Sequence, residues 1–164
     1  MCTCATYADI EFLRSAVRER VKASRALKKS FTLVAKHSSG EHKLYSCPDC
    51  GQLWQGSRAW NWGDDEYLFC IPTVSIEAWL QEVFVQPDEL MIYVATMRSV
   101  LDEGRFVAGK AACEAHGCER VAVEGLATCL PHHVQALQHA GQLAKEPSGR
   151  WFGPYVRGDV VPAL

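Results

Sequence analysis

Long apolar runs are scarce in this sequence. Every apolar stretch is interrupted by charged residues well before the roughly 18 residues that a membrane-spanning helix needs. The opening segment, MCTCATYADIEF, also lacks the apolar centre of a secretory signal peptide. We therefore expect a cytoplasmic protein that has no transmembrane segment and does not act at a membrane.

The common catalytic signatures are missing as well. The sequence contains no P-loop, no GxSxG, no HExxH and no strand-associated GxGxxG motif. A deaminase would need a His-x-Glu motif ahead of its Cys-x-x-Cys pair, and none precedes Cys47 and Cys50. A cysteine-protease pair of Cys70 and His139 is the weaker alternative. We therefore predict a protein that is not an enzyme and has no catalytic residues.

What the sequence has in quantity is cysteine. Eight cysteines occur in 164 residues, and the apolar fraction of 48% is ordinary for a globular protein. In a reducing compartment, cysteines are more often metal ligands than disulfide partners. Sets of four ligands with metal-binding spacing are therefore the first candidates for a functional role.

The most informative pair lies in the stretch YSCPDCGQLW, which contains Cys47 and Cys50. The pair follows one strand-like segment and precedes another, and a glycine comes directly after Cys50. The stretch resembles one half of a zinc ribbon, in which a Cys-x-x-Cys turn presents both thiolates to one metal ion. A thioredoxin-like redox pair is the alternative, but it would lie between a strand and a helix.

A zinc ribbon needs a second pair of ligands. Cys2 and Cys4 are the first candidates, because a Cys-x-Cys pair in an extended chain can turn both sulfurs to one side. His37 and His42, on either side of a predicted hairpin turn, are the alternative pair. Cys70 lies inside an apolar segment and is expected to be a core residue.

A second ligand set lies near the C-terminus. Its spacing is Cys113-x4-Cys118-x10-Cys129-x2-His132. The segment resembles small bacterial zinc motifs, in which a knuckle supplies two ligands and the start of a helix supplies two more. A small hairpin with its bend at Gly125 is expected to bring the two halves together.

The fourth ligand of this second set is ambiguous, because His133 follows His132 directly and His116 lies inside the knuckle. Each set would surround a metal ion with four protein ligands, which is typical of structural rather than catalytic zinc. We therefore predict two structural Zn²⁺ sites. Their ligands are Cys2, Cys4, Cys47 and Cys50 in the first, and Cys113, Cys118, Cys129 and His132 in the second.

The hydrophobic periodicity predicts an α+β fold. A helix over residues 7–28 is expected to bury one stripe of side chains, formed by Ile10, Leu13, Val17, Val21 and either Ser24 or Arg25. A small antiparallel sheet is predicted from residues 31–37, 42–47, 51–55 and 67–72, with a loop over 56–66. Further helices are predicted over residues 76–84, 87–104 and 131–144, the first of them burying Ile76, Trp79, Leu80 and Phe84.

Two domains follow from these elements. Residues 1–108 are predicted to form the α+β domain, with the N-terminal helix and the ribbon-like site. Residues 109–164 are predicted to form a smaller zinc-binding helical subdomain that packs on the first. The change of composition at Cys113, where the Cys/His segment begins, motivates this division.

Charge is distributed unevenly along the chain. Residues 1–60 carry ten Lys/Arg against five Asp/Glu, whereas residues 61–164 carry seven against fourteen. Such a split can indicate a surface for nucleic acid or for an acidic partner, although two oppositely charged faces of one fold are the simpler interpretation. The basic residues gather on the predicted first helix, where Arg14, Arg18, Arg25 and Lys29 are the candidate nucleic-acid contacts.

The function expected from these features is a non-enzymatic, zinc-stabilised protein-interaction module. Tryptophan and tyrosine are typical anchors of interfaces, and acidic residues beside them suit a basic partner. The candidate interface consists of Trp60, Trp62, Asp64, Asp65 and Glu66. The resemblance to small zinc-ribbon proteins suggests an accessory or toxin-neutralising role, and the alternative is a nucleic-acid-binding zinc-ribbon protein.

Overall fold

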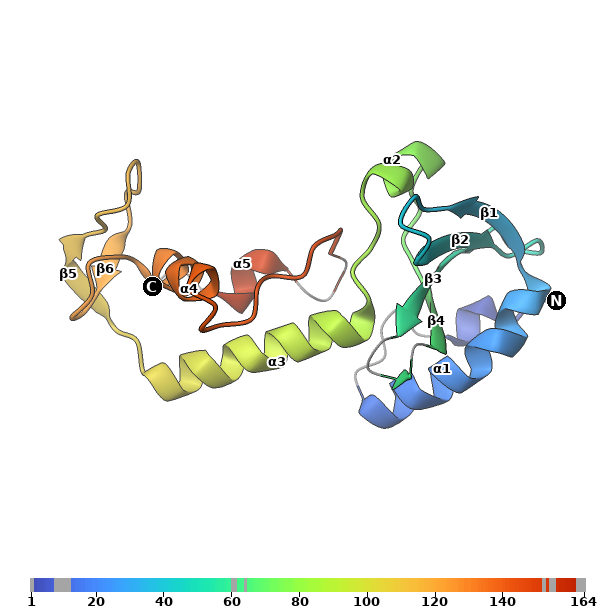
Figure 1. Cartoon of the computed structure of the whole chain (residues 1–164), viewed down its shortest axis with the longest axis horizontal. Coiled ribbons are helices and arrows are strands. Elements are labelled where there is room, and N and C mark those ends of the chain that lie inside the picture. The colour runs from blue at the N-terminus through green and yellow to red at the C-terminus, as the bar shows by residue number, and fades with distance from the viewer. Residues whose placement is uncertain are drawn as a thin grey trace. The chain divides into compact units, whose positions relative to one another are not determined.

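The computed structural model describes residues 2–7, 13–59, 62–63, 65–151, 153 and 156–161 (Figure 1). The chain divides into two compact units. Unit 1 comprises Met1–Met91 and Ser148–Phe152, and unit 2 comprises Ile92–Pro147 and Gly153–Leu164. The predicted domain boundary after residue 108 stays a prediction, because compactness alone does not show which segments fold independently.

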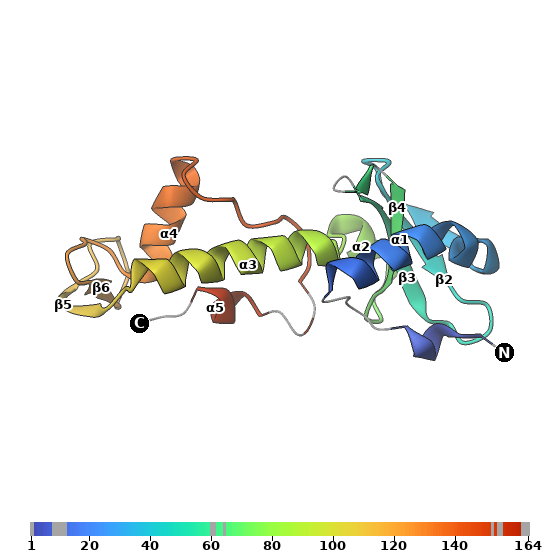
Figure 2. The same cartoon turned by 90° about the horizontal axis from the view of Figure 1, so that it is seen from below.

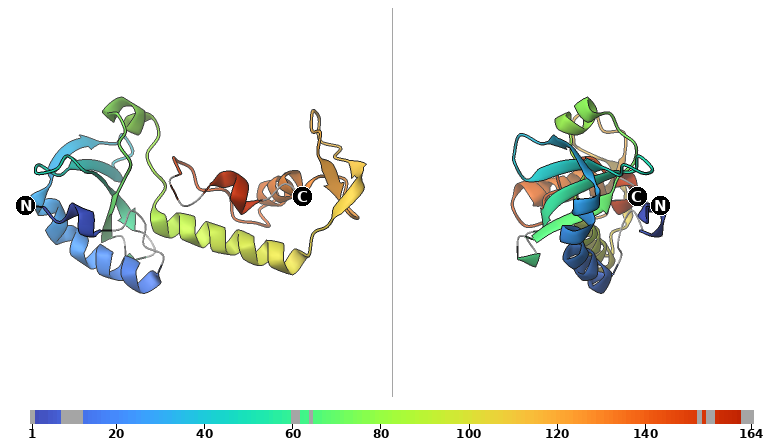
Figure 3. Two further views of the ribbon diagram at one scale, coloured as in Figure 1. Left: turned by 180° about the vertical axis from the view of Figure 1, so that it is seen from behind. Right: turned by 90° about the vertical axis from the view of Figure 1, so that its right-hand side faces the viewer.

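The four strands of unit 1 form an antiparallel sheet in the order β1–β2–β3–β4 (Figures 1 and 3). Their bounds are Thr32–Lys36, His42–Ser46, Leu53–Ala59 and Asp65–Cys70. This sheet, together with the helices, confirms the predicted α+β fold. Leu33 on β1 is 44% exposed, and the register of β1 against β2 shifts between Leu33 and Ala35.

Strands β3 and β4 extend into the segment 56–66, which was predicted to be a loop. Gly56 provides the physical reason. A Cβ atom at this position would lie 2.6 Å from a carboxylate oxygen of Glu66 and 3.1 Å from the ring of Tyr45. The missing side chain therefore leaves room for Tyr45 to donate its hydroxyl hydrogen to Glu66 across the sheet, at 3.0 Å.

Helix α1 (Arg14–Leu27) lies along β4, the last strand of the sheet (Figure 2). Two of its side chains bind the backbone of Leu68 at the edge of that strand. The Ser24 hydroxyl oxygen accepts the Leu68 N–H at 2.9 Å, and the Arg20 guanidinium donates to the Leu68 carbonyl at 3.4 Å. Backbone groups that an edge strand would leave open are thus bound by the helix.

The buried stripe of α1 is confirmed for Val17, Val21 and Ser24, which are at most 7% exposed. It is wrong for Leu13, which is 68% exposed because it precedes the first helical turn. Ile10 lies outside the described residues. Ser24 rather than Arg25 completes the stripe, because its hydroxyl can be buried once it is hydrogen-bonded.

Arg20 belongs to the buried side of α1, unlike the other arginines of this helix. It is 5% exposed. Its guanidinium lies 4.5 Å from the ring centre of Tyr7 and 5.6 Å from that of Trp54. Stacking on aromatic rings and the bond to the backbone compensate for the loss of hydration of this charge.

Gln55 is fully buried inside unit 1 and uses both ends of its amide. Its Oε1 accepts from the indole N–H of Trp79 at 2.9 Å and from the backbone N–H of Phe84 at 3.0 Å. Its Nε2 donates to the Phe84 carbonyl at 2.8 Å and to the Ser57 hydroxyl oxygen at 2.9 Å. This one side chain joins β3 to α2 (Ile76–Gln81) and to the segment after it.

Replacing Gln55 with Leu is expected to lower the free energy of unfolding by about 2–5 kcal/mol. The change leaves the polar groups of Trp79 and Phe84 buried without partners, and each such group costs roughly 1–3 kcal/mol. Urea denaturation measures the effect. Gln81→Leu at the exposed end of α2 is the matched control and should change stability by less than about 0.5 kcal/mol. Equal stability of the two variants would contradict the role given to Gln55.

Helix α2 begins as predicted, with the Ser75 hydroxyl oxygen accepting a backbone N–H of the first turn at 3.2 Å. Trp79 is fully buried, but Ile76 and Leu80 are 42% and 41% exposed, so the predicted inward stripe is wrong for these two residues. The helix ends at Gln81 rather than at residue 84, and a helix of fewer than two turns presents only one narrow stripe to its neighbours.

The segment after α2 pairs with a short stretch from far along the chain. Phe84 and Arg150 form an isolated parallel bridge. The Arg150 N–H donates to the Val83 carbonyl at 2.7 Å, and the Val85 N–H donates to the Arg150 carbonyl at 3.0 Å. Phe84 is therefore buried, as predicted, but it lies in this bridge and not in the helix.

Unit 2 contains most of α3 (Pro87–Gly104), the two-stranded ribbon of β5 (Ala108–Ala112) and β6 (Val121–Val123), α4 (Leu130–His139) and α5 (Arg157–Val160). Figure 3 shows the ribbon with α4 beside it. The predicted bounds of α3 are confirmed. Helix α4 was predicted to reach Ala144 but ends earlier, because Gly141 adopts a left-handed conformation with φ +71°. None of the helices in the described ranges is both long and apolar enough to cross a bilayer.

Two candidate metal centres and a polar cavity

The first candidate metal centre is built on the turn between β2 and β3. The Cys47 N–H donates to the Gln52 carbonyl and the Gly51 N–H donates to the Cys47 carbonyl, both at 2.9 Å. Gly51 has φ +74°, a conformation that costs glycine little and other residues much more. The glycine after Cys50 therefore closes a tight knuckle that turns both cysteines to the same side.

Cys2 and Cys4 complete this first cluster. The four Sγ atoms of Cys2, Cys4, Cys47 and Cys50 lie within 4.8 Å of one another. Cys4 and Cys47 are buried, and both belong to a hydrophobic cluster that also contains Trp54. The N-terminal segment is thus brought to the knuckle, and the sequence prediction of this ligand set agrees with the geometry.

Aromatic side chains pack around the first cluster. The ring of Phe31 stacks on Trp54 with ring centres 5.0 Å apart, and Tyr7 meets the same indole edge-on at 5.5 Å. Cys70 is 2% exposed and packs in this hydrophobic cluster, so its predicted position in the core is confirmed. The indole of Trp54, itself fully buried, therefore reports on the state of the neighbouring cysteines.

The protonation states in the first cluster favour one thiolate. Burial and a hydrogen bond with Cys47 raise the pKa of the Cys4 thiol to about 12. Burial also acts to raise the pKa of Cys47, but the backbone N–H groups of Cys50 and Asp49 outweigh it and lower that pKa to about 7. Backbone donors aimed at a sulfur stabilise the thiolate, which is the form that binds metal.

The second candidate metal centre lies in unit 2, between the β5–β6 ribbon and α4. Cys113 follows β5, and its N–H donates to the Arg120 carbonyl at 2.9 Å. Cys129 occupies the N-cap of α4, so that His132 lies on the first helical turn next to it. The ligand atoms of Cys113, Cys118, Cys129 and His132 lie within 4.8 Å of one another.

The spacing within the second cluster matches a tetrahedral site. The Nδ1 atom of His132 lies 3.4 Å from the sulfur of Cys113 and 3.3 Å from that of Cys129, and the sulfurs of Cys118 and Cys129 are 3.9 Å apart. Tetrahedral zinc with ordinary bond lengths places two sulfurs about 3.8 Å apart, and a sulfur and a nitrogen about 3.6 Å apart. The four side chains therefore surround a space of the right size for one ion.

The structure places one of the two adjacent histidines in the second cluster. His132 belongs to the cluster, whereas the ring of His133 lies edge-on against Phe106, with ring centres 5.7 Å apart. His116 is exposed and outside the cluster. The predicted bend at Gly125 exists, but it joins β6 to Cys129 and does not connect the strands of the ribbon.

Backbone donors also favour a thiolate in the second cluster. The N–H of Cys129 donates to the Cys113 sulfur at 3.2 Å. Together with the backbone of Ala115 and the ring of His132, this bond outweighs burial and lowers the pKa of Cys113 to about 6. The pKa of Cys118 is raised: the Arg120 backbone acts to lower it, but burial and the neighbouring Cys113 outweigh that effect. Both clusters can thus hold a metal ion, and all eight cysteines of the chain are free of disulfides.

In the acidic part of the candidate interface, Glu66 is less available to a partner protein than the sequence suggested. Glu66 lies within β4, where it accepts hydrogen bonds from Lys28 and Tyr45 and faces Lys43 at 3.8 Å. Burial acts to raise its pKa, but these partners hold it below the usual range. Asp65 is exposed at the start of the same strand.

Of the two tryptophans in the candidate interface, the structure describes Trp62. Trp62 is half-buried, and the guanidinium of Arg14 lies 5.2 Å from its ring centre. Trp60 and Asp64 lie outside the described residues. The structure therefore brings Trp62 together with a cation of α1, a pairing that the sequence did not predict.

The candidate nucleic-acid contacts on the first helix are all exposed. Arg14, Arg18 and Arg25 lie on α1, and Lys29 lies in the short turn that follows it. Their spacing of four, seven and four residues places them along one side of the helix. Apart from the stacking of Arg14 on Trp62, no ion pair engages these four residues within the described chain.

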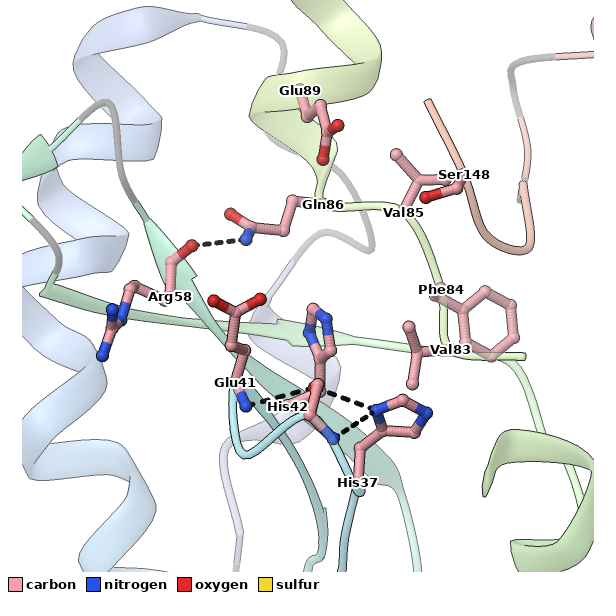
Figure 4. Close-up of a pocket in the computed structure, with 11 residues that line it drawn as sticks. His37, Glu41, His42, Arg58, Val83, Phe84, Val85, Gln86, Glu89 and Ser148 are labelled. Carbon is pink, nitrogen blue, oxygen red and sulfur yellow. Dashed lines mark hydrogen bonds between the residues drawn. The ribbon is translucent and has the colours of Figure 1, made fainter. Parts of the chain in front are cut away.

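A polar cavity of about 410 Å³ lies on unit 1, beside the turn between β1 and β2. Figure 4 shows His37 and His42 on one side of it and Gln86 and Glu89 on the other. The two imidazole rings meet edge-on, with their centres 5.8 Å apart. The alternative in which these histidines complete the first metal centre is therefore wrong, because they line this cavity and lie outside the cysteine cluster.

Sequence reasoning missed this cavity as a site. Val83, Phe84 and Val85 form one wall, and they lie more than forty residues from the histidines in the sequence. The presence of one histidine on each side of a Ser-Ser-Gly-Glu turn was a visible signal of a possible site. Nothing in the sequence, however, shows which distant segment covers the turn.

No family model matches the sequence, and the searches of curated proteins and of solved structures gave no significant match. The fold and the two clusters therefore define only a class: an α+β protein with two four-ligand centres that can hold metal ions.

Proposed function

We propose that both clusters bind Zn²⁺ as structural sites. Sets of four thiolates, or of three thiolates and one imidazole, are the usual ligands of structural zinc. The observation that carries this proposal is the completeness of both ligand sets, since each contributes four protein ligands and leaves no open coordination position for a substrate. In the first site, zinc would join the N-terminal segment to the β2–β3 knuckle, as in a zinc ribbon.

The function that follows is that of a non-enzymatic, zinc-stabilised protein-interaction module in the cytoplasm. Structural zinc stabilises small surfaces that would otherwise lack a sufficient core. The exposed Asp65 and the Arg14–Trp62 pair support a contact surface at this end of unit 1. An accessory or toxin-neutralising protein of bacterial type, which binds one partner tightly, is the specific form that we favour.

Nucleic-acid binding is the second candidate function. The observation that favours it is the exposed row of Arg14, Arg18, Arg25 and Lys29 along α1. Phosphate contacts dominate the affinity of such proteins, and each neutralised phosphate makes binding more sensitive to salt. The pI near 6.3 argues against a dedicated nucleic-acid binder, which is usually basic over a large surface.

A pull-down from the native host distinguishes the two functions. We expect the tagged protein to retain a defined protein partner that survives nuclease treatment, and Trp62→Ala to reduce the amount retained several-fold, because aromatic anchors carry much of the binding energy of interfaces. The double variant Arg18→Glu, Arg25→Glu should retain that partner. Mass spectrometry identifies the retained species.

The opposite result would favour nucleic acid. Retention that disappears with nuclease, together with loss of binding and a salt-dependence slope shallower by about 2 in the Arg18→Glu, Arg25→Glu variant, would replace the protein-interaction proposal. Recovery of no specific partner under either condition would remove the support for both.

A further inference from the structure

The polar cavity holds hydrogen-bonding groups that the described chain leaves unused. Gln86 is 6% exposed, and its Nε2 donates to the Arg58 carbonyl, but its Oε1 is buried and accepts no hydrogen bond from the described residues. A buried carbonyl of this kind costs free energy unless a partner binds it. Gln86 thus lines the cavity with an amide whose oxygen has no hydrogen-bond partner among the described residues.

Two carboxylates face the same cavity. Glu41 lies in the β1–β2 turn and Glu89 in the first turn of α3, and neither forms an ion pair within the described ranges. Burial and the neighbouring Asp88 raise the pKa of Glu89. An unpaired carboxylate in such surroundings gains from a cation placed beside it.

Both histidines are organised by hydrogen bonds behind them. The backbone N–H of Ser39 donates to Nδ1 of His37 at 3.3 Å, so the proton of the neutral ring lies on Nε2. The Ser57 hydroxyl, whose oxygen accepts from Gln55, lies 2.8 Å from Nδ1 of His42 and holds that ring in place. The neutral ring of His37 consequently carries an Nε2–H that can donate to an acceptor on a ligand.

The net charge of the lining is negative. Burial and the nearby His37 lower the pKa of His42, so that its ring is neutral at neutral pH. The guanidinium of Arg58 points away from the histidines, and only its backbone meets Gln86 (Figure 4). Two carboxylates and one buried carbonyl therefore dominate the electrostatics of the cavity.

The arrangement of acceptor groups around the cavity indicates which kind of cation fits. Apart from the two cysteine clusters, no three His, Cys, Asp or Glu ligands in the described chain lie within 4.8 Å of one another, so the lining does not match a bare metal ion. A guanidinium is planar, carries five N–H donors and can bind a carboxylate, an amide oxygen and an aromatic face together. A lysine ammonium is a compact charge, and it would leave some of the acceptors that line the cavity without a hydrogen bond.

We propose that this cavity binds the side chain of an arginine residue from a partner protein. The guanidinium lies between Glu41 and Glu89, beside the amide of Gln86, and a peptide carbonyl of the partner accepts from the imidazole N–H of His37. The inference rests on the proposed protein-interaction function and names the group that this module recognises.

Binding of small probes tests this inference without knowledge of the partner. N-acetyl-arginine-N-methylamide should bind the zinc-loaded protein at least about tenfold more tightly than its citrulline counterpart, which has the same shape without the charge. The lysine counterpart should bind more weakly than arginine. Agmatine, which lacks the peptide carbonyls, should also bind more weakly. NMR titration, followed at the histidine ring resonances, gives the dissociation constants.

Matched variants locate the site. Glu41→Gln and Glu89→Gln should each weaken binding of the arginine probe about tenfold, whereas Glu77→Gln on the exposed surface of α2 should not change it. Glu41 is exposed in a turn, so its replacement tests the site even if Glu89→Gln alters folding. Equal affinity for arginine and citrulline, or unchanged binding by both cavity variants, would overturn the inference.

The experiments distinguish failure of the cavity proposal from failure of the proposed protein-interaction function. If agmatine binds more tightly than the arginine peptide, the ligand of the cavity is a free guanidine compound and not the side chain of a partner protein. That result would overturn the inference. Loss of arginine discrimination, combined with a nuclease-resistant partner in the pull-down, would refute the cavity proposal while the protein-interaction function stands.

Discussion

His132→Ala is expected to lower the zinc content from two ions per chain to one and to unfold the ribbon and the start of α4. Structural zinc contributes on the order of 10 kcal/mol to the folding of small modules. Unit 2 joins β5, β6 and α4 at this one cluster, and the loss of one of four ligands should remove most of that contribution. Elemental analysis and thermal melting measure the two effects.

His133→Ala is the matched control for this change. The two residues are adjacent and chemically identical, but His133 packs on Phe106 and does not reach the sulfurs. The control should keep two zinc ions and lose at most about 1 kcal/mol of stability. A reversed pattern would show that the neighbouring histidine is the ligand, and two zinc ions in both variants would contradict the tetrahedral site.

Cys47→Ser is expected to have a comparably large effect on unit 1. The Cys47 thiolate is the best stabilised of the first cluster, and its loss should release the metal and free Cys2 and Cys4 from the knuckle. We expect one zinc ion per chain, a lower yield of folded protein and a red shift in the fluorescence of Trp54. Proteolysis near the N-terminus should become faster, because the metal no longer holds that segment.

Cys70→Ala provides the control for this second variant. Cys70 packs in the same hydrophobic cluster but is not one of the four ligands. Its replacement should cost about 1 kcal/mol, as expected for a small buried group, and should leave two zinc ions bound. A well-folded Cys47→Ser protein with an unchanged melting temperature would refute a structural metal at this site.

The ligand sets were the part of the site that the sequence predicted best. Cysteine spacing carries this information because four ligands must meet at one point, and few combinations of eight cysteines satisfy that requirement. Cys2 and Cys4 were preferred to His37 and His42 because a Cys-x-Cys pair in an extended chain can turn both sulfurs to one side. The choice between His132 and His133 could not be made in the same way, because both residues lie on the same helical turn.

The fold was predicted where periodicity was strong and missed where tertiary contacts overrode it. The bounds of α3 followed from its apolar stripe and from the residues at its ends. The burial of Arg20 could not be predicted, because the partners that compensate for it, the rings of Tyr7 and Trp54 and the carbonyl of Leu68, are brought to it only by the fold. The segment that begins at Gly56 was predicted to be a loop. The reason for a glycine within a strand at this position is its close approach to Glu66, ten residues away, which the local sequence does not reveal.

The polar cavity shows the same limit of local reasoning. Apart from the two histidines, its groups are unremarkable in the sequence: a turn, a glutamine and a glutamate at the start of a helix. Their chemistry arises only when the segment from Val83 to Gln86 covers the β1–β2 turn. Gln55 holds that segment in place through Phe84, so a core residue indirectly determines the shape of the cavity.

The two edges of the four-stranded sheet differ in how they can respond to another chain. At β4, Ser24 and Arg20 already bind the outward backbone groups of Leu68, so an incoming strand would first have to displace a helix. Growth of the sheet by aggregation or strand exchange is therefore directed to β1, where the register irregularity before Ala35 and the charge of Lys36 oppose a flat pairing. Loosening α1 would expose the outward backbone groups of Leu68, so a protein damaged in that helix should aggregate more readily.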